Sequence, residues 1–230
     1  MKKIAVLLPD LPQKTFIKPL DENLSFLASQ GCHIDYIDPF DYHEDVENIT
    51  FYANWKARLN KMEPDYDAFF GFSFGGVILQ QCFDLFEHGE KPIVLFSTPT
   101  KADVFLTEKL SHVIAQCQKG LLYDALNDLY AWVFAPYKLE HTNYPIDDEA
   151  EALERMITGL SRVLETDSTE VMQKTNARFI HFIGEHSNLV TRKNIIMPAS
   201  GLLLTVPNAG MRVLKDNPNF CQSIILDYVL

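Results

Sequence analysis

The chain has 230 residues, of which 47% are hydrophobic and 22% are charged. This composition excludes an intrinsically disordered chain, and the length favours one globular domain that buries its core without disulfide staples. With 20 basic and 31 acidic residues, the formal charge is −11. We therefore expect neither nucleic acid nor an anionic membrane as a partner, because both would repel this surface.

The cysteine pattern and the hydropathy predict a cytoplasmic, soluble protein. The four cysteines lie far apart and form no C-x-x-C pair, so they are expected to be free thiols in a reducing compartment. The first apolar run ends at Pro9 and Asp10, too early for a signal peptide. No run of about 18 apolar residues, as a transmembrane helix requires, occurs in the chain.

Short apolar runs alternate with longer helical patterns in the first hundred residues. The pattern predicts strands at 4–8, 33–37, 68–72 and 93–96, separated by helices at 16–30, 46–62 and 75–87. The unbroken apolar run at 4–8 is typical of a strand covered on both faces. Gly31 stands where a glycine commonly closes a helix, so it marks the end of the first one.

The hydrophobic pattern changes after the fourth predicted strand. Residues 101–174 show helical patterning without a clear strand, whereas strands return at 179–183 and 202–206 before a final helix at 219–230. We predict a doubly wound, mostly parallel α/β sheet of about six strands, formed by 1–100 and 175–230. The helical insertion at 101–174 is expected to cover the carboxyl ends of the strands, where such sheets bind ligands.

One motif in the chain points to chemistry. Residues 71–76 read Gly-Phe-Ser-Phe-Gly-Gly, a match to G-x-S-x-G between a predicted strand and a predicted helix. Such a turn strains the backbone of Ser73, and small residues at Gly71 and Gly75 avoid a collision. The hydroxyl then stands at a helix N-terminus, where the dipole favours a developing anion. The pattern indicates a nucleophile elbow; the alternative is a tight turn with an inert serine.

On this motif, and over nearly its whole length, the chain resembles the α/β-hydrolase superfamily, particularly its small cofactor-free esterases and thioesterases. Residues 4–12 resemble the strand and loop of the oxyanion hole, and the insertion resembles the helical cap domain. Residues 179–190 and 207–220 resemble the segments that bear the catalytic acid and histidine. The resemblance implies no cofactor, a small acyl substrate, Ser73 as nucleophile, and backbone N–H groups of Leu11 and Phe74 as the oxyanion hole.

The chain departs from the superfamily pattern at both helper positions. Met211 stands where the histidine is usual, and a thioether cannot accept a proton at neutral pH. Ser187 occupies the position of the acid, and Asp10 stands in the loop that often contains His-Gly. Asp10 would oppose an oxyanion if its charge pointed inward. The nucleophile is therefore present without its usual base and acid.

The histidines offer one candidate for a relocated base. His186 lies in the loop where the acid usually sits, and Glu185 or Asp103 could orient it; alternatively, it is an exposed loop histidine. His181 lies within a predicted strand and is expected to be a core residue. The remaining histidines are His33, His43, His88, His112 and His141, and none has the spacing of a metal site.

Aromatic residues surround the motif and recur in the insertion. Phe72 and Phe74 flank the serine, and Tyr123, Tyr130, Trp132 and Phe134 follow one another in a helical segment of the insertion. These residues could form an apolar substrate-binding pocket for an acyl chain, in which we include Phe72, Trp132 and Phe134. Packing of the cap against the sheet is the alternative explanation.

The sequence is compatible with three functions. The first is a serine ester or thioester hydrolase with a non-standard proton relay. The second is a catalytically impaired hydrolase-fold protein that binds an acyl ligand or a protein partner. The third is a non-hydrolase domain whose glycine turn binds an anion at a helix N-terminus. The substrate and the oligomeric state also remain open.

Overall fold

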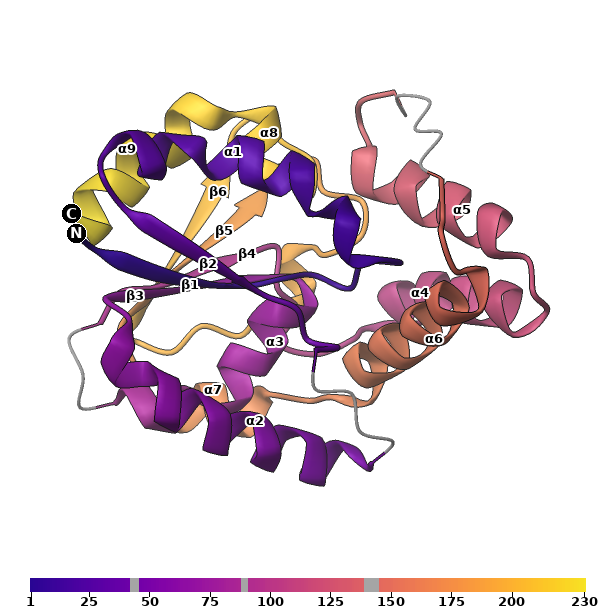
Figure 1. Cartoon of the computed structure of the whole chain (residues 1–230), viewed down its shortest axis with the longest axis horizontal. Coiled ribbons are helices and arrows are strands. Elements are labelled where there is room, and N and C mark those ends of the chain that lie inside the picture. The colour runs from indigo at the N-terminus through magenta and orange to yellow at the C-terminus, as the bar shows by residue number, and fades with distance from the viewer. Residues whose placement is uncertain (42–45, 88–90, 139–144) are drawn as a thin grey trace.

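The computed structural model describes residues 1–41, 46–87, 91–138 and 145–230. Six strands form one parallel sheet in the order β2-β1-β3-β4-β5-β6 (Figure 1). They are β1 (Lys3–Leu7), β2 (His33–Ile37), β3 (Ala68–Phe72), β4 (Ile93–Phe96), β5 (Phe179–Gly184) and β6 (Gly201–Val206). The predicted α/β class and the number of strands are confirmed, and the sheet is entirely parallel.

Helices cover both faces of the sheet. One face carries α1 (Lys18–Ser29), α8 (Val213–Asp216) and α9 (Pro218–Val229); the other carries α2 (Asn48–Met62), α3 (Phe74–Gln81) and α7 (Thr169–Lys174) (Figure 1). In β1, Ile4 and Val6 pack toward the first face, while Ala5 and Leu7 pack toward the second. This two-sided burial explains why the strand is apolar at every position.

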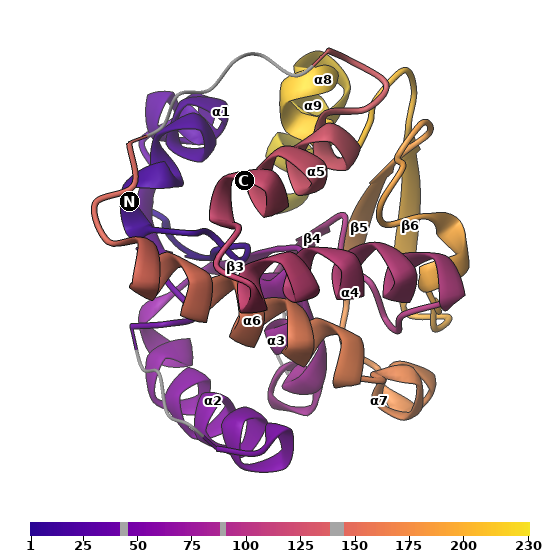
Figure 2. The same cartoon turned by 90° about the vertical axis from the view of Figure 1, so that its right-hand side faces the viewer.

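The cap consists of α4 (Val104–Gln118), α5 (Leu122–Phe134) and α6 (Glu149–Glu165). These helices lie beyond the carboxyl ends of the strands, and Figure 2 looks onto them from that end. Asp103 and Asp148 cap α4 and α6 by accepting hydrogen bonds from backbone N–H groups of the first turn. No helix in the described ranges is long and apolar enough to cross a membrane.

Several helix ends differ from the sequence prediction. The helix expected at 16–30 begins at Lys18, after a short 3-10 turn, and has Pro19 in its first turn. The helix expected at 75–87 ends at Gln81 and continues as a 3-10 turn at Phe83–Phe86. Gly31 follows Gln30, the C-cap residue of α1, and has φ of +79°, as its predicted capping role requires.

Candidate active site

The backbone at Ser73 is strained at the junction of β3 and α3. Its φ of 47° and ψ of −110° lie in a region that residues with side chains rarely adopt. A Cβ atom at Gly75 would lie 2.3 Å from the carbonyl oxygen of Leu7, and one at Gly71 would lie 2.6 Å from Cα of Gly76. The turn therefore has the geometry that the motif predicts, and its glycines are required by the packing of β1, β3 and α3.

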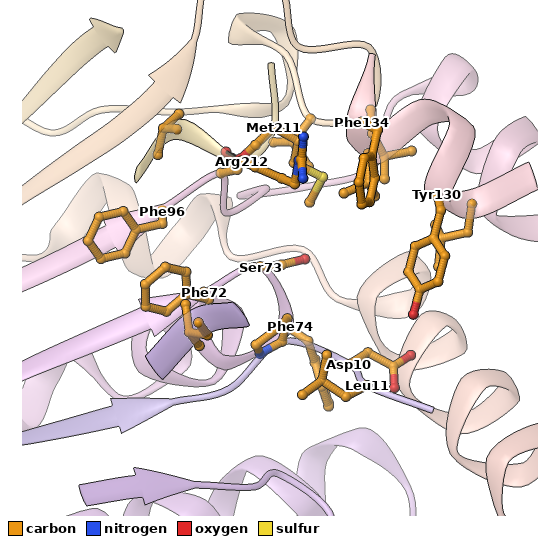
Figure 3. A pocket seen from close by; sticks show the side chains of 18 of the residues that line it. Asp10, Leu11, Phe72, Ser73, Phe74, Phe96, Tyr130, Phe134, Met211 and Arg212 are labelled. Carbon is orange, nitrogen blue, oxygen red and sulfur yellow. Dashed lines mark hydrogen bonds between the residues drawn. The ribbon is translucent and has the colours of Figure 1, made fainter. Parts of the chain in front are cut away.

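Ser73 is half-buried and borders a cavity of about 400 Å³ between the strand ends and the cap. Figure 3 shows Ser73 between two groups of side chains: Asp10, Leu11 and Phe74 on one side, Met211 and Arg212 on the other. Most of the lining is apolar. The cap contributes Leu106, Leu110, Leu129, Tyr130, Val133, Phe134, Leu160 and Val163. The cavity is suited to an apolar ligand with few polar contacts.

The two residues expected to form an oxyanion hole both line this cavity. Phe74 is the first residue of α3, so its N–H has no carbonyl one turn earlier in the helix. Leu11 lies in the loop after β1, and its carbonyl oxygen accepts a hydrogen bond from Nε of Arg155 at 2.9 Å. Arg155 thus ties the backbone of the loop to α6 of the cap.

Arg155 and Asp38 form a buried ion pair that the sequence analysis missed. Nη2 of Arg155 lies 3.1 Å and 2.9 Å from the two carboxylate oxygens of Asp38, and the guanidinium lies 4.5 Å from the ring centroid of Phe40. Asp38 follows β2, whereas Arg155 lies on the buried face of α6 with Ala152. An arginine within that apolar stripe was the available sequence signal. The pair joins the cap to the end of the sheet beside Leu11.

The carboxyl group of Asp10 is buried at the cavity wall. Neither of its oxygens has a hydrogen-bond partner among the described residues. It lies beside Gly159 of α6, where a Cβ atom would come within 2.5 Å of the carboxyl carbon. Burial raises the pKa of Asp10 well above its ordinary value, and the charge of Asp38 adds to this although Arg155 opposes it. The protonated form is favoured, which reduces the repulsion that Asp10 would exert on an oxyanion.

We expect Asp10 to make the free energy of unfolding fall as the pH rises. Above about pH 4 the unfolded chain has lost this proton while the folded chain keeps it, so unfolding releases a proton. The loss is up to about 1.4 kcal/mol per pH unit until the raised pKa is passed.

The variant Asp10→Asn removes this titration and so tests the expectation. In urea unfolding from pH 5 to 8, its stability advantage over the wild type should grow with pH, whereas the exposed-acid control Asp124→Asn should show no such growth. A constant difference for Asp10→Asn would contradict the burial argument.

The structure does not bring His186 to this cavity. Its side chain is half-exposed, and its Nε2 lies 3.7 Å from a carboxylate oxygen of Glu185. The carboxylate of Glu185 also accepts a hydrogen bond from the N–H of Asn208, and Asp103 is engaged as the cap of α4. His186 and both acids expected to orient it therefore lie outside the lining of the Ser73 cavity.

The other described histidines do not line the cavity either. His181 is fully buried in β5, its Nε2 accepts a hydrogen bond from the N–H of Thr98 at 3.1 Å, and burial lowers its pKa to about 3. His33 and His112 contact aspartates at the surface. His43, His88 and His141 lie outside the described residues. Within the described ranges, no group of three His, Cys, Asp or Glu side chains is placed to hold a metal ion.

The two replaced helper positions have different surroundings. Met211 lines the cavity, and its carbonyl oxygen accepts a hydrogen bond from the hydroxyl of Ser97 at 2.8 Å (Figure 3). Ser187 does not line the cavity, and its hydroxyl is buried without a hydrogen-bond partner in the described part of the chain. A histidine at 211 would face the cavity, whereas a carboxylate at 187 would not contribute to its lining.

The predicted substrate-binding aromatics are divided by the structure. Phe72 and Phe134 line the cavity, and Phe72 stacks on Phe96 with 4.2 Å between ring centroids. Trp132 is not part of the lining; its ring lies 6.3 Å from that of His112 and 5.1 Å from Nζ of Lys109. Tyr130 completes the aromatic wall of the cap (Figure 3). Tyr123, in contrast, is exposed and donates a hydrogen bond to Glu149.

Comparison with known proteins finds resemblance only at the level of structure. No family model matches the chain, and no curated protein matches it in sequence. The enzyme MGS-M2, an α/β hydrolase from a Medee basin deep-sea metagenome library, superposes with a TM-score of 0.72 at 12% identity, over 99% of this chain and 88% of its own.

Two esterase structures give similar agreement. An esterase from Exiguobacterium antarcticum superposes with a TM-score of 0.71 at 14% identity, covering 100% of this chain and 92% of its own. The carboxylesterase CesB from Bacillus subtilis superposes with a TM-score of 0.63 at 15% identity, covering 99% of this chain and 83% of its own. At such identities the likeness concerns the fold alone. The chain has the α/β-hydrolase fold, which it shares with esterases and other hydrolases.

Proposed function

We propose that the protein is a serine hydrolase that cleaves an ester or thioester of a small carboxylic acid. The observation that carries this proposal is the strained turn at Ser73, whose hydroxyl borders an apolar cavity beside Leu11 and Phe74. A non-glycine residue held in such a backbone conformation is often part of a functional site. The apolar side chains of the cap supply the surface for an acyl chain.

In the proposed reaction, Oγ of Ser73 bonds to the acyl carbonyl carbon and its proton passes to a base. The N–H groups of Leu11 and Phe74 stabilise the negative charge on the former carbonyl oxygen. The alcohol or thiol leaves with a proton, and water then releases the acid from Ser73. No described histidine lines the cavity, and burial favours the protonated form of Asp10, so the proton relay proposed here differs from that of a Ser-His-Asp triad.

Labelling with a fluorophosphonate tests whether Ser73 is nucleophilic. We expect one covalent adduct per chain, mapped to Ser73 by mass spectrometry and absent from Ser73→Ala. Ser97→Ala is the matched control, since Ser97 also lines the cavity with positive φ, but its hydroxyl donates to Met211. This variant should retain the adduct. No adduct at Ser73 after prolonged incubation with excess probe would contradict the proposal.

A second function is favoured by the residues around Ser73. Met211 faces the cavity at the usual histidine position, and no described histidine lines it. Loss of triad partners typically lowers the rate by about 10⁴-fold. The protein could thus bind an acyl compound, and even be acylated, without turnover. With p-nitrophenyl butyrate, this alternative predicts at most one equivalent of p-nitrophenolate, whereas an active hydrolase releases many. A gain of turnover in the double variant Met211→His, Ser187→Asp would support the alternative.

A further inference from the structure

Arg212 carries unused hydrogen-bonding capacity at the wall of the Ser73 cavity. A guanidinium has five N–H donors, and none of those of Arg212 is hydrogen-bonded to another described residue. Its Nε is buried without an acceptor, and the side chain is only 24% exposed. The side chain stacks on Phe134, with the guanidinium carbon 3.6 Å from the ring centroid. This contact holds the guanidinium against the aromatic wall of the cavity (Figure 3).

The neighbouring Asp216 does not satisfy this arginine. Its Oδ1 lies 3.6 Å from Nη2 of Arg212, beyond hydrogen-bond distance. Its Oδ2 already accepts a hydrogen bond from the N–H of Gly210 at 2.9 Å. Burial raises the pKa of Asp216 even though Arg212 and Lys215 oppose the shift. A close ion pair with Arg212 would instead lower the pKa of the Asp216 carboxyl. Asp216 therefore does not account for the burial of the arginine.

The remaining charged groups of the lining also leave room for an anion. Glu22 and Lys215 are exposed at the cavity and have opposite charges, while Asp10 lies in the other group of side chains, beside Leu11 (Figure 3). Arg212 is therefore the half-buried cation on its side of the cavity, in a chain whose formal charge is −11. A planar guanidinium with free N–H groups matches the geometry of a carboxylate.

We propose that Arg212 binds a carboxylate of the ligand, so that the cavity accepts acyl compounds with a second, ionised carboxyl group, such as monoesters of dicarboxylic acids. The ester carbonyl would lie at Ser73 and the carboxylate at Arg212. The substrate class rests on the proposed hydrolase function, but binding of the carboxylate does not require Ser73 to react. An experiment can therefore contradict carboxylate binding by Arg212 without contradicting the hydrolase function, and the reverse.

Calorimetric titration of the Ser73→Ala protein tests the binding directly. The probes are monomethyl succinate, monomethyl glutarate and monomethyl adipate, each compared with its dimethyl ester, which lacks the charge. We expect at least one monoester to bind about tenfold or more tightly than its diester, as a charge-assisted hydrogen bond predicts. The preferred chain length reports the separation of Ser73 and Arg212.

Arg212→Gln should abolish the preference for the monoester while leaving the affinity for the diester within about threefold. Arg178→Gln is the matched control: this arginine also stacks on an aromatic ring, at 5.6 Å from that of Tyr228, but does not line the cavity. It should keep the preference. The proposal is overturned if no monoester is preferred at any length, or if the preference survives in Arg212→Gln or is lost instead in Lys215→Gln. Labelling of Ser73 in the wild type reports separately on the hydrolase function.

Discussion

Gly75→Ala is expected to destabilise the protein by more than about 4 kcal/mol, an exceptional effect for one methyl group. The added Cβ would lie 2.3 Å from the carbonyl oxygen of Leu7 and 2.6 Å from that of Leu8. Both contacts involve the backbone of β1 or of the residue after it, so rotation of a side chain cannot relieve them. β1 cannot retreat either, because it is hydrogen-bonded between β2 and β3.

The matched control is Gly31→Ala. Gly31 has φ of +79°, and a Cβ there would meet nothing within 4 Å. Only conformational strain remains, which costs roughly 1–2 kcal/mol. Urea unfolding followed by circular dichroism compares the two variants, with yield of folded protein as a second readout. Equal losses of stability would show that the contact between α3 and β1 is not what requires glycine at 75.

Arg155→Met is expected to lower the free energy of unfolding by about 3–5 kcal/mol, because it leaves the buried carboxylate of Asp38 without its partner. The double variant Arg155→Met, Asp38→Leu should recover much of this loss, since it removes both buried charges. Arg155→Met should also slow the phosphonate labelling of Ser73 in protein that is still folded. The reason is that the carbonyl of Leu11 loses its hydrogen bond to Nε of Arg155.

Arg162→Met is the control that separates an effect on the free energy of unfolding from an effect on the labelling of Ser73. Arg162 is likewise buried on α6 and donates hydrogen bonds to Asn48 and to the carbonyl of Val46, but no such bond ties it to Leu11. We expect this variant to lose about 1–3 kcal/mol of stability without a slower reaction at Ser73. Labelling rates in native buffer, corrected for the folded fraction, provide the measurement. If Arg155→Met labels as fast as the wild type, Arg155 stabilises the cap without positioning the loop.

Local patterns in the sequence determined the sheet, most of its helices and the turn at Ser73. Strands β3 and β4 begin and end where the apolar runs do, because burial on both faces demands continuous hydrophobicity. The elbow could be predicted for a related reason. Its requirement for small residues comes largely from the close approach of strand, turn and helix, which the spacing of Gly71, Ser73 and Gly75 encodes directly.

The polar surroundings of Ser73 were decided by tertiary structure alone. Arg155 and Asp38 are 117 positions apart, and only the docking of α6 over the end of β2 makes them a buried pair. The raised pKa of Asp10 has the same origin, since Gly159 and the rest of the cap remove its carboxyl from water. Sequence position suggested His186 as a base, yet the loop after β5 directs this histidine away from the cavity. The cavity is lined instead by Arg212. Side-chain direction in loops depends on contacts between distant segments, and these leave no periodic signal in the sequence.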